Sequence, residues 1–259
     1  MQRYMIAPEQ WVADTVTLTG DDAHHLMNVM RAAVDEKIWV SDGEQREGLV
    51  IITDIQKGKV TGRVEEERAL EGEPQIEVWI AQSLPKGDKL ETVIQKGTEL
   101  GATRFIPFQS ARTIVQYDAK KEIKRLERWR KIIKEAAEQA HRSCIPVMER
   151  PLSWKEMLEA VQPADAIYFC YERPDGAGLR TMLSELRAKW SNSGSATERL
   201  KVAVIVGPEG GFTEAEAEEA KRHRASWITL GKRILRTETA AMAALACILY
   251  EFDEMGGPE

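Results

Sequence analysis

Two glycine-bearing stretches near the C-terminal end hold the residues whose types and spacing point most directly to chemistry. In the first, the apolar run KVAVIV is followed by GPEGGFT, and in the second, WITL is followed by GKRILRTETAAM. Each loop leaves a predicted strand and enters a predicted helix, so backbone N–H groups and a helix N-terminus can meet a small ligand. The pair of loops therefore predicts a ligand site within residues 201–250.

The first loop owes its shape to glycine. Gly207, Gly210 and Gly211 allow backbone angles or close approaches that a Cβ atom would forbid. Thr213 and Glu216 form a capping-box pattern that begins the next helix. The spacing matches neither a P-loop, which needs Lys and Ser/Thr after the last glycine, nor the dinucleotide pattern G-x-G-x-x-G. Taken alone, the loop is more typical of a structural turn.

The second loop carries cations where a helix does not favour them. Thr237 is the predicted N-cap of the last helix, and Arg233 and Arg236 lie just before that positive helix end. A bound anion would explain them. Exposure to solvent, or ion pairs with Glu209 or Glu238, would explain them equally well.

Apolar residues accompany these charges. Ile234 and Leu235 lie between the two arginines and could wall a slot of the kind that an adenine ring needs. The apolar run Ala240–Tyr250 is too short to span a bilayer and predicts a buried helix.

Composition bounds the class of protein. With 259 residues, 43% apolar and 30% charged, the chain predicts one or two soluble domains. Residues 1–19 mix polar and apolar side chains, so no signal peptide is expected. The three cysteines and four histidines have no metal-ligand or redox spacing. We therefore expect reduced thiols, no metal site, no membrane association and a cytoplasmic location.

Charge is unevenly distributed along the chain, whose net charge is -6. Residues 1–72 hold eight Lys/Arg against fourteen Asp/Glu, whereas Lys120–Lys134 holds eight basic residues against two acidic ones. The basic stretch predicts either a solvated helix face with i,i+4 ion pairs or a patch that faces phosphates.

Periodicity divides the chain into two parts. Residues 1–68 contain short β-rich runs and one helical pattern, Asp21–Ala32, which suggest a small barrel-like domain, and Glu65–Pro74 is the predicted linker. After Pro74, strands and helices alternate, which predicts a mostly parallel sheet covered by helices. The predicted strands are 76–82, 104–108, 146–150, 165–172, 201–206 and 227–230. The predicted helices include 88–100, 119–142 and 179–190, and a further helix begins at the capping-box pattern Ser153/Glu156. Residues 191–196 are a predicted flexible loop.

Four motifs, in this order and spacing, closely resemble the RsmE family of 16S ribosomal RNA uridine methyltransferases, members of the SPOUT superfamily. They are KGDKLETVIQKGTELGATRFIPFQSARTIV, EAAEQAHRSCIP, VGPEGGFTEAE and LGKRILRTETAAMAAL. The resemblance implies an α/β protein with an N-terminal PUA-like β-barrel for RNA binding (1–72) and a C-terminal SPOUT methyltransferase domain (73–259). That second domain would have a mostly parallel sheet and a deep trefoil knot.

The same resemblance implies a homodimer that uses S-adenosylmethionine to methylate N3 of a uridine in 16S ribosomal RNA of the small subunit. Three loops would make the cofactor pocket, with the matching residues Tyr171, Glu172, Gly207, Pro208, Glu209, Gly210, Gly211, Leu230, Gly231, Ile234, Leu235 and Arg236. Methyl transfer from a sulfonium needs an in-line nucleophile more than a metal, so positioning should supply most of the rate.

Uracil N3–H is a weak acid, so its proton must be removed or its anion stabilised. Arg236 near O2 or O4 is the electrostatic candidate. Glu209 or Glu238 is the candidate base, and either is equally a structural partner for an arginine.

For RNA binding, the positions that match the family are Arg3, His24, His25, Arg31, Lys86, Lys89 and Lys96. The histidines are also consistent with an ordinary helix surface, and Lys96 with a side chain that snorkels from an amphipathic helix. Gln139 and Arg142 match the family's EQxxR and are as readily structural as catalytic. Residues 173–199 match no family segment.

Three other functions stay open at this stage. The first is a ribose 2′-O-methyltransferase of the same superfamily, and the second is an RNA- or ribosome-binding module without catalysis. The third is a nucleotide-using enzyme on a Rossmann-like sheet, against which the missing G-x-G-x-x-G counts.

Overall fold

A computed structural model describes residues 2–43, 46–69, 73–172, 177–192 and 199–256. The chain forms two compact units. The first comprises residues 1–73 and 137–145, and the second comprises 74–136 and 146–259. The segment 137–145 thus joins the first unit although it is distant in sequence, which a single boundary at residue 72 does not anticipate.

The first unit is built on a six-stranded sheet in the order β1-β4-β5-β6-β3-β2. Its strands are β1 (Arg3–Met5), β2 (Trp11–Val12), β3 (Thr15–Thr19), β4 (Lys37–Ser41), β5 (Arg46–Gln56) and β6 (Lys59–Ala69). Neighbours pair antiparallel except β1 and β4, which are parallel. Alternate residues of these strands, such as Val16, Leu18, Val50 and Ile52, are fully buried and form the core of this unit.

Two predictions for the first unit are wrong in detail. The helix expected over Asp21–Ala32 is split into α1 (Gly20–His24) and the π-helical turn η2 (His25–Val29). The first half of the linker expected over Glu65–Pro74 is strand, because β6 continues pairing with β5 as far as Ala69. Its run of glutamates looked like a linker, yet most of these side chains face outward from a paired strand. Residues 70–72 of that linker lie outside the described residues.

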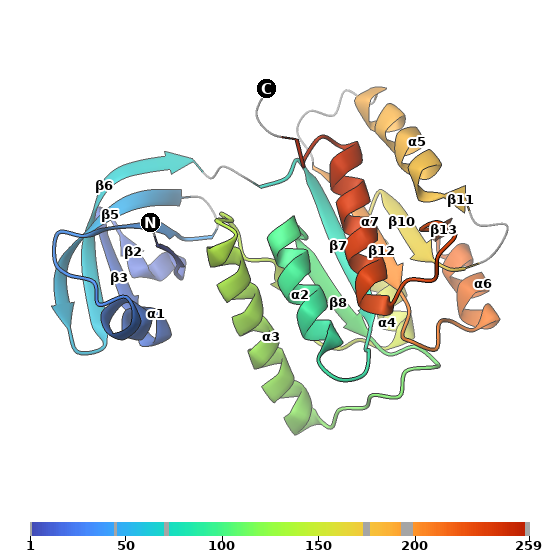
Figure 1. The fold of residues 1–259 in the computed structure, drawn as a ribbon, viewed down its shortest axis with the longest axis horizontal. Coiled ribbons are helices and arrows are strands. Elements are labelled where there is room, and N and C mark those ends of the chain that lie inside the picture. The colour runs from blue at the N-terminus through green and yellow to red at the C-terminus, as the bar shows by residue number, and fades with distance from the viewer. Residues whose placement is uncertain (1, 44–45, 70–72, 173–176, 193–198, 257–259) are drawn as a thin grey trace. The chain divides into compact units, whose positions relative to one another are not determined.

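The second unit is built on a seven-stranded sheet in the order β11-β13-β10-β12-β7-β8-β9 (Figure 1). The strands are β7 (Ile76–Ser83), β8 (Arg104–Phe108), β9 (Val147–Met148), β10 (Ala166–Cys170), β11 (Ala177–Gly178), β12 (Leu200–Val206) and β13 (Ser226–Thr229). Within the described residues, every strand pair of this second sheet is parallel. This confirms an α/β fold with a mostly parallel sheet.

Helices cover both faces of this sheet, because alternate strand residues point to opposite sides. Val78 and Ile80 face a core that includes α2 (Lys89–Leu100), α3 (Ala119–Gln139), α5 (Leu179–Asn192) and α7 (Thr237–Glu251). Trp79 and Ala81 face a second core that includes α4 (Trp154–Ala160) and α6 (Glu214–Arg222). The near-continuous apolar runs of β7 and β12 follow from this burial on both faces.

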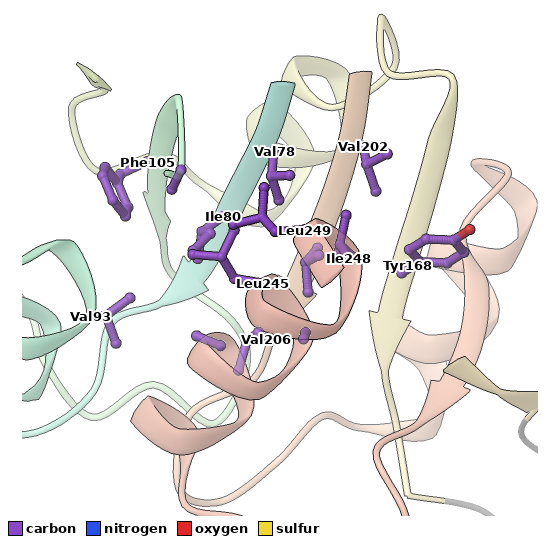
Figure 2. Packing of buried hydrophobic residues seen from close by; sticks show 14 of the residues in the cluster. Val78, Ile80, Val93, Phe105, Tyr168, Val202, Val206, Leu245, Ile248 and Leu249 are labelled. Atoms are coloured by element: carbon purple, nitrogen blue, oxygen red, sulfur yellow. The ribbon is translucent and has the colours of Figure 1, made fainter. Parts of the chain in front are cut away.

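The last helix packs on the centre of the sheet. Leu245, Ile248 and Leu249 of α7 are buried beside Val78 and Val202 of the two central strands (Figure 2). This packing places the start of α7 near the carboxyl ends of the strands. No helix of the described residues is long and apolar enough to cross a membrane.

Helix ends follow their predicted signals in two cases. The capping boxes Ser153/Glu156 and Thr213/Glu216 begin α4 and α6, as predicted. α5 runs to Asn192, and residues 193–196 of the predicted flexible loop lie outside the described part of the chain.

The third helix, α3, ends at Gln139 and not at Arg142. His141 adopts a left-handed backbone (φ 56°), and the chain then enters the first unit. There the Arg142 guanidinium lies 2.5 Å from the Glu73 carboxylate, and both side chains are 5% exposed. The amides of Ser143 and Cys144 donate to the same carboxylate. This arrangement gives Arg142 a structural role.

The buried pair yields a stability prediction. Glu73→Ala leaves the Arg142 guanidinium buried without this carboxylate, so we expect a loss of about 3–5 kcal/mol in the free energy of unfolding. The control is Glu65→Ala, which breaks the half-exposed Lys37–Glu65 pair of the same unit and should cost less than about 1 kcal/mol. Urea denaturation measures both, and equal effects would contradict the assignment.

Candidate functional site

A cavity of about 770 Å³ lies at the carboxyl ends of three neighbouring parallel strands of the second unit. β10, β12 and β13 end at Cys170, Val206 and Thr229, and all three residues line it. The other lining residues lie on or beside the loops that follow these strands, on the first turn of α7, and at Lys89 and Arg112. Ligands of open α/β sheets bind at this edge.

Glycines allow the loop after β12 to fold tightly against its surroundings. A Cβ atom at Gly207 would lie 3.0 Å from the Phe212 ring, and Gly211 has a left-handed backbone (φ +65°). Arg112 donates a hydrogen bond of 2.7 Å from Nη1 to the carbonyl of Gly210. The Phe212 ring therefore packs against Gly207 within the loop, and the Arg112 guanidinium binds the loop at Gly210.

The loop after β13 forms another wall. Gly231 has φ +108°, a conformation that favours glycine, and its carbonyl accepts a hydrogen bond from the Thr229 hydroxyl. Leu230 and Leu235 are half-buried, whereas the Ile234 side chain, on a residue that is 85% exposed, borders the cavity. An apolar side chain with that exposure is available to contact a ligand.

The predicted cap of α7 is wrong. Arg236, with an extended backbone (φ −65°, ψ 153°), is the N-cap, and Thr237 is the first helical residue. The Thr237 hydroxyl does not cap the helix, because it donates a hydrogen bond of 2.6 Å to the carbonyl of Gly207. No side chain caps α7 in the described structure, so amides of its first turn are open to other acceptors.

The two arginines of this loop border the cavity and are exposed. Within the described residues, neither Arg233 nor Arg236 forms an ion pair or a side-chain hydrogen bond. The ion pairs with Glu209 or Glu238 that would have explained these arginines are therefore absent from the described structure. Two guanidinium groups beside an uncapped helix start favour an anionic ligand group.

Glu209 is instead bound to α2. Its Oε1 lies 2.5 Å from Nζ of Lys89 and accepts a hydrogen bond from the amide of Lys86. Burial acts to raise the pKa of the Glu209 carboxyl, but hydrogen bonds from Lys89 and from the amides of Glu209 and Lys86 outweigh it. The pKa is therefore held below its usual value. Glu209 is ionised at neutral pH, and its lowered pKa makes it a weak base. Its carboxylate instead holds the loop after β12 against Lys86 and Lys89.

The structure brings most predicted cofactor residues together. Eleven of them line the cavity: Tyr171, Glu172, Gly207, Pro208, Glu209, Gly211, Leu230, Gly231, Ile234, Leu235 and Arg236. Gly210 and Glu238 do not line it. One carboxylate oxygen of Glu238 is buried with no hydrogen-bond partner among the described residues.

Of the lysines predicted to bind RNA, only Lys89 lines the cavity. Lys86 is exposed at its rim through the contact with Glu209, and Lys96 forms an ion pair with Glu99 one turn further along α2.

The four RNA-binding candidates of the first unit differ in environment. Arg3 is 8% exposed, and its guanidinium lies 2.6 Å from the buried Glu47 carboxylate. His24, His25 and Arg31 are exposed, and the ring of His25 shares a 2.9 Å hydrogen bond with the hydroxyl of Tyr4. Arg3 is therefore engaged within the unit, whereas the other three are accessible.

Sequence reasoning missed several lining residues. Phe212 belongs to the GPEGGFT motif and could have been included, because it directly follows the glycines. Arg112 lies in the irregular segment between β8 and α3, where no periodicity indicates a position. Lys89 was assigned to RNA because its motif says nothing of the partner, Glu209, that brings it to the cavity rim.

The lining suits a ligand with both an apolar ring and charged groups. Ile228, Leu230 and Ala240 offer apolar surface, while the arginines and Glu172 bring charge of both signs. The volume lies within the range of about 300–1,000 Å³ that is usual for small-molecule sites. Among the described residues, no three His, Cys, Asp or Glu side chains are grouped so as to hold a metal ion.

The chain matches two protein-domain families. Residues 72–249 match the RNA methyltransferase domain, and residues 18–65 match the RNA methyltransferase PUA domain. The fold and the site are therefore those of an RNA methyltransferase.

Individual relatives show which family of RNA methyltransferases the chain resembles. The chain is 40% identical to Ribosomal RNA small subunit methyltransferase E of Bacillus subtilis over the full length of both chains. It is 35% identical to the protein of that name from Synechocystis, over 95% of this chain and 76% of that one. The chain belongs to the ribosomal RNA small subunit methyltransferase E family, which confirms the resemblance seen in its motifs.

A solved structure agrees with this placement. The Neisseria gonorrhoeae Ribosomal RNA small subunit methyltransferase E, bound to S-adenosyl methionine, is similar with a TM-score of 0.79 and 29% sequence identity. The similarity covers 96% of this chain and 97% of that one. The similarity therefore includes residues of both units.

The Glu209 clamp yields a titration prediction. Lys89→Ala removes the ammonium that most lowers the pKa of Glu209, so that pKa should rise, and ¹³C NMR titration of the carboxyl carbon would measure the shift. Lys96→Ala is the control, because Lys96 pairs with Glu99 instead. An unchanged Glu209 midpoint in Lys89→Ala would show that the pair does not persist in solution.

Proposed function

We propose that this chain is an S-adenosylmethionine-dependent methyltransferase that methylates N3 of a uridine in 16S ribosomal RNA of the small subunit. The observation that carries the proposal is the cavity at the strand ends, whose rim bears two arginines with no partner in the described structure. Membership of the small subunit methyltransferase E family supports the same reaction.

The cofactor is assigned to the cavity because the lining fits it. The apolar residues Leu230, Ile234 and Leu235 would contact the adenine ring, and amides of the loop after β12 would bind polar edges. When bound, S-adenosylmethionine supplies a methyl group activated by its sulfonium. The chain then has to hold the uracil in line and exclude water from the reacting atoms.

Arg236 is the proposed electrostatic group. Removal of the N3 proton leaves negative charge on the uracil oxygens, and a guanidinium held at the cavity without a carboxylate partner can stabilise it. Glu209 is engaged by Lys89 and has a lowered pKa, which favours a role in holding the loop over a role as the base. Glu238 stays a candidate base through its buried, unpartnered oxygen.

The RNA surface is proposed separately for each unit. In the first unit it comprises the exposed His24, His25 and Arg31, and it omits the buried Arg3. In the second unit it comprises exposed cations of α3, and it omits Arg125 and Arg128, which are paired with Glu91. Those exposed cations are Lys120, Lys121, Lys124 and Arg130.

Four finer features belong to the proposal because the family resemblance implies them. They are closure of the first sheet into a PUA-like barrel, a deep trefoil knot in the second unit, a homodimer and a cytoplasmic location. The functional division at residue 72 into an RNA-binding part and a methyltransferase part is proposed on the same ground. Light scattering of the purified protein tests the homodimer.

The reaction is tested by nucleoside mass spectrometry of 16S ribosomal RNA. RNA from a strain that lacks this protein should lose one 3-methyluridine, and the purified protein with S-adenosylmethionine should restore it. Loss of a ribose-methylated nucleoside instead would identify a 2′-O-methyltransferase. Unchanged modification, with RNA still bound, would identify a binding module without catalysis.

Arg236→Ala should reduce methyl transfer by about 10²–10³-fold, because it removes a preorganised charge from the transition state. Lys232→Ala is the matched control, since Lys232 is an exposed cation of the same loop that does not line the cavity. Single-turnover rates measure both variants, and circular dichroism checks their folds. Wild-type turnover in Arg236→Ala would remove this residue from the mechanism.

A further inference from the structure

A buried chain of hydrogen bonds connects the two loops of the cavity to the central strand β7. Gln82, next to the end of β7 and 1% exposed, donates from Nε2 to the Thr237 hydroxyl at 2.8 Å. Thr237 in turn donates to the Gly207 carbonyl at 2.6 Å. Gly207 and Thr237 line the cavity, whereas Gln82 lies behind them and does not. We call these three residues the Gln82 relay.

The direction of every bond in the Gln82 relay is determined. The Gln82 amide nitrogen also faces the carbonyls of Ser83 at 3.0 Å and Gly207 at 3.4 Å, and carbonyls only accept. The NH₂ group must therefore point toward them. Because Thr237 accepts from that group, its single hydroxyl hydrogen is directed to Gly207.

This arrangement lowers the stability of the fold. Thr237 follows the N-cap, yet its hydroxyl is used between loops and caps no helix amide. In the described part of the chain, Oε1 of Gln82 is buried without a hydrogen-bond partner. A buried polar group left unsatisfied destabilises a protein, and an apolar residue would avoid the penalty. Such a loss at the base of a cavity points to a function.

We propose that Gln82 is a positioning residue that acts through Thr237 to set the separation between the loop after β12 and the start of α7. The Gln82 relay thereby sets the affinity for S-adenosylmethionine, and this inference rests on the proposed function. The Gly207 carbonyl accepts from the Thr237 hydroxyl at 2.6 Å, so its peptide plane is held.

Without the Gln82 relay, that carbonyl is free to turn and the first turn of α7 is free to shift. Either change would alter the relative positions of the amides and side chains that bind the cofactor together. The effect should appear in cofactor binding and leave the affinity for RNA unchanged.

Four variants test the Gln82 relay. Gln82→Met removes the hydrogen bond from Gln82 to Thr237, and Thr237→Val removes both hydrogen bonds of the Thr237 hydroxyl. Thr237→Ser keeps the hydroxyl, and the double variant combines Gln82→Met with Thr237→Val. Thr98→Val is the matched control, because Thr98 is also a buried threonine and its hydroxyl donates to the carbonyl of Ile94 within α2. Isothermal titration calorimetry gives Kd for S-adenosylmethionine, and steady-state rates give KM for the cofactor and for RNA.

We expect Thr237→Val and Gln82→Met to weaken cofactor binding about tenfold, which corresponds to about 1.4 kcal/mol. KM for the cofactor should rise with it, while KM for RNA stays constant. Thr237→Ser should bind within about twofold of wild type. The double variant should lose no more than the worse single variant, because the two residues act as one unit. Thr98→Val should lower Tm without changing Kd.

Several outcomes would overturn the inference. Wild-type Kd in a folded Thr237→Val or Gln82→Met would do so, and so would an equal loss of binding in Thr98→Val, since that loss would reflect general stability. Multiplicative losses in the double variant would refute a single relay. If Thr237→Val does not fold, the Kd of Gln82→Met for S-adenosylmethionine alone tests the inference. Wild-type protein that binds no S-adenosylmethionine would instead refute the proposed function, and the inference with it.

Discussion

The burial of α7 against the two central strands is the interaction on which the site depends. Leu245, Ile248 and Leu249 contribute one side of this contact, and each buried side chain of this size stabilises the fold by about 1.5–3 kcal/mol. The contact lies near the middle and the end of the helix, while its uncapped start reaches the strand ends. The apolar side chains of α7 thus position the helix, and the backbone amides of its first turn stay available at the cavity.

Charges around the cavity fall into two groups. Glu209 is neutralised by Lys89, and the carbonyl of Gly210 accepts from Arg112, so these groups stabilise the loop that carries them. Arg233 and Arg236 have no such partner among the described residues and stay available to a ligand. Charged residues on one side of the cavity therefore hold its loop, whereas the two arginines on the other side are not used in this way within the described structure.

In the first unit, buried ion pairs occur where the chain returns from α3. Arg142 is paired with Glu73, and Arg3 with Glu47, in positions where each charge is almost fully removed from water. Such pairs are costly to break, because the remaining charge stays buried. They explain how the segment 137–145, which continues a helix of the second unit, is held in the first.

Local patterns by themselves determined a large part of this protein. Alternation of apolar runs predicted the parallel sheet, Ser153/Glu156 and Thr213/Glu216 predicted two helix starts, and the glycine-bearing loops predicted the location of the cavity. These features depend on neighbours within a few residues, so the sequence contains them directly. The motifs also determined the family, because their order and spacing are specific.

Only the tertiary structure decided what each polar residue of the site does. Thr237 has the type and position of an N-cap, yet a carbonyl 30 residues away takes its hydroxyl. Glu209 could pair with Arg233 or Arg236, yet it pairs with Lys89, 120 residues away. No sequence pattern indicated the role of Gln82, because the apolar pattern of a strand does not show which loops lie beside the end of that strand. A hydrogen bond goes to the partner that the fold brings within about 3 Å, and that partner is set by packing of distant elements and not by local sequence.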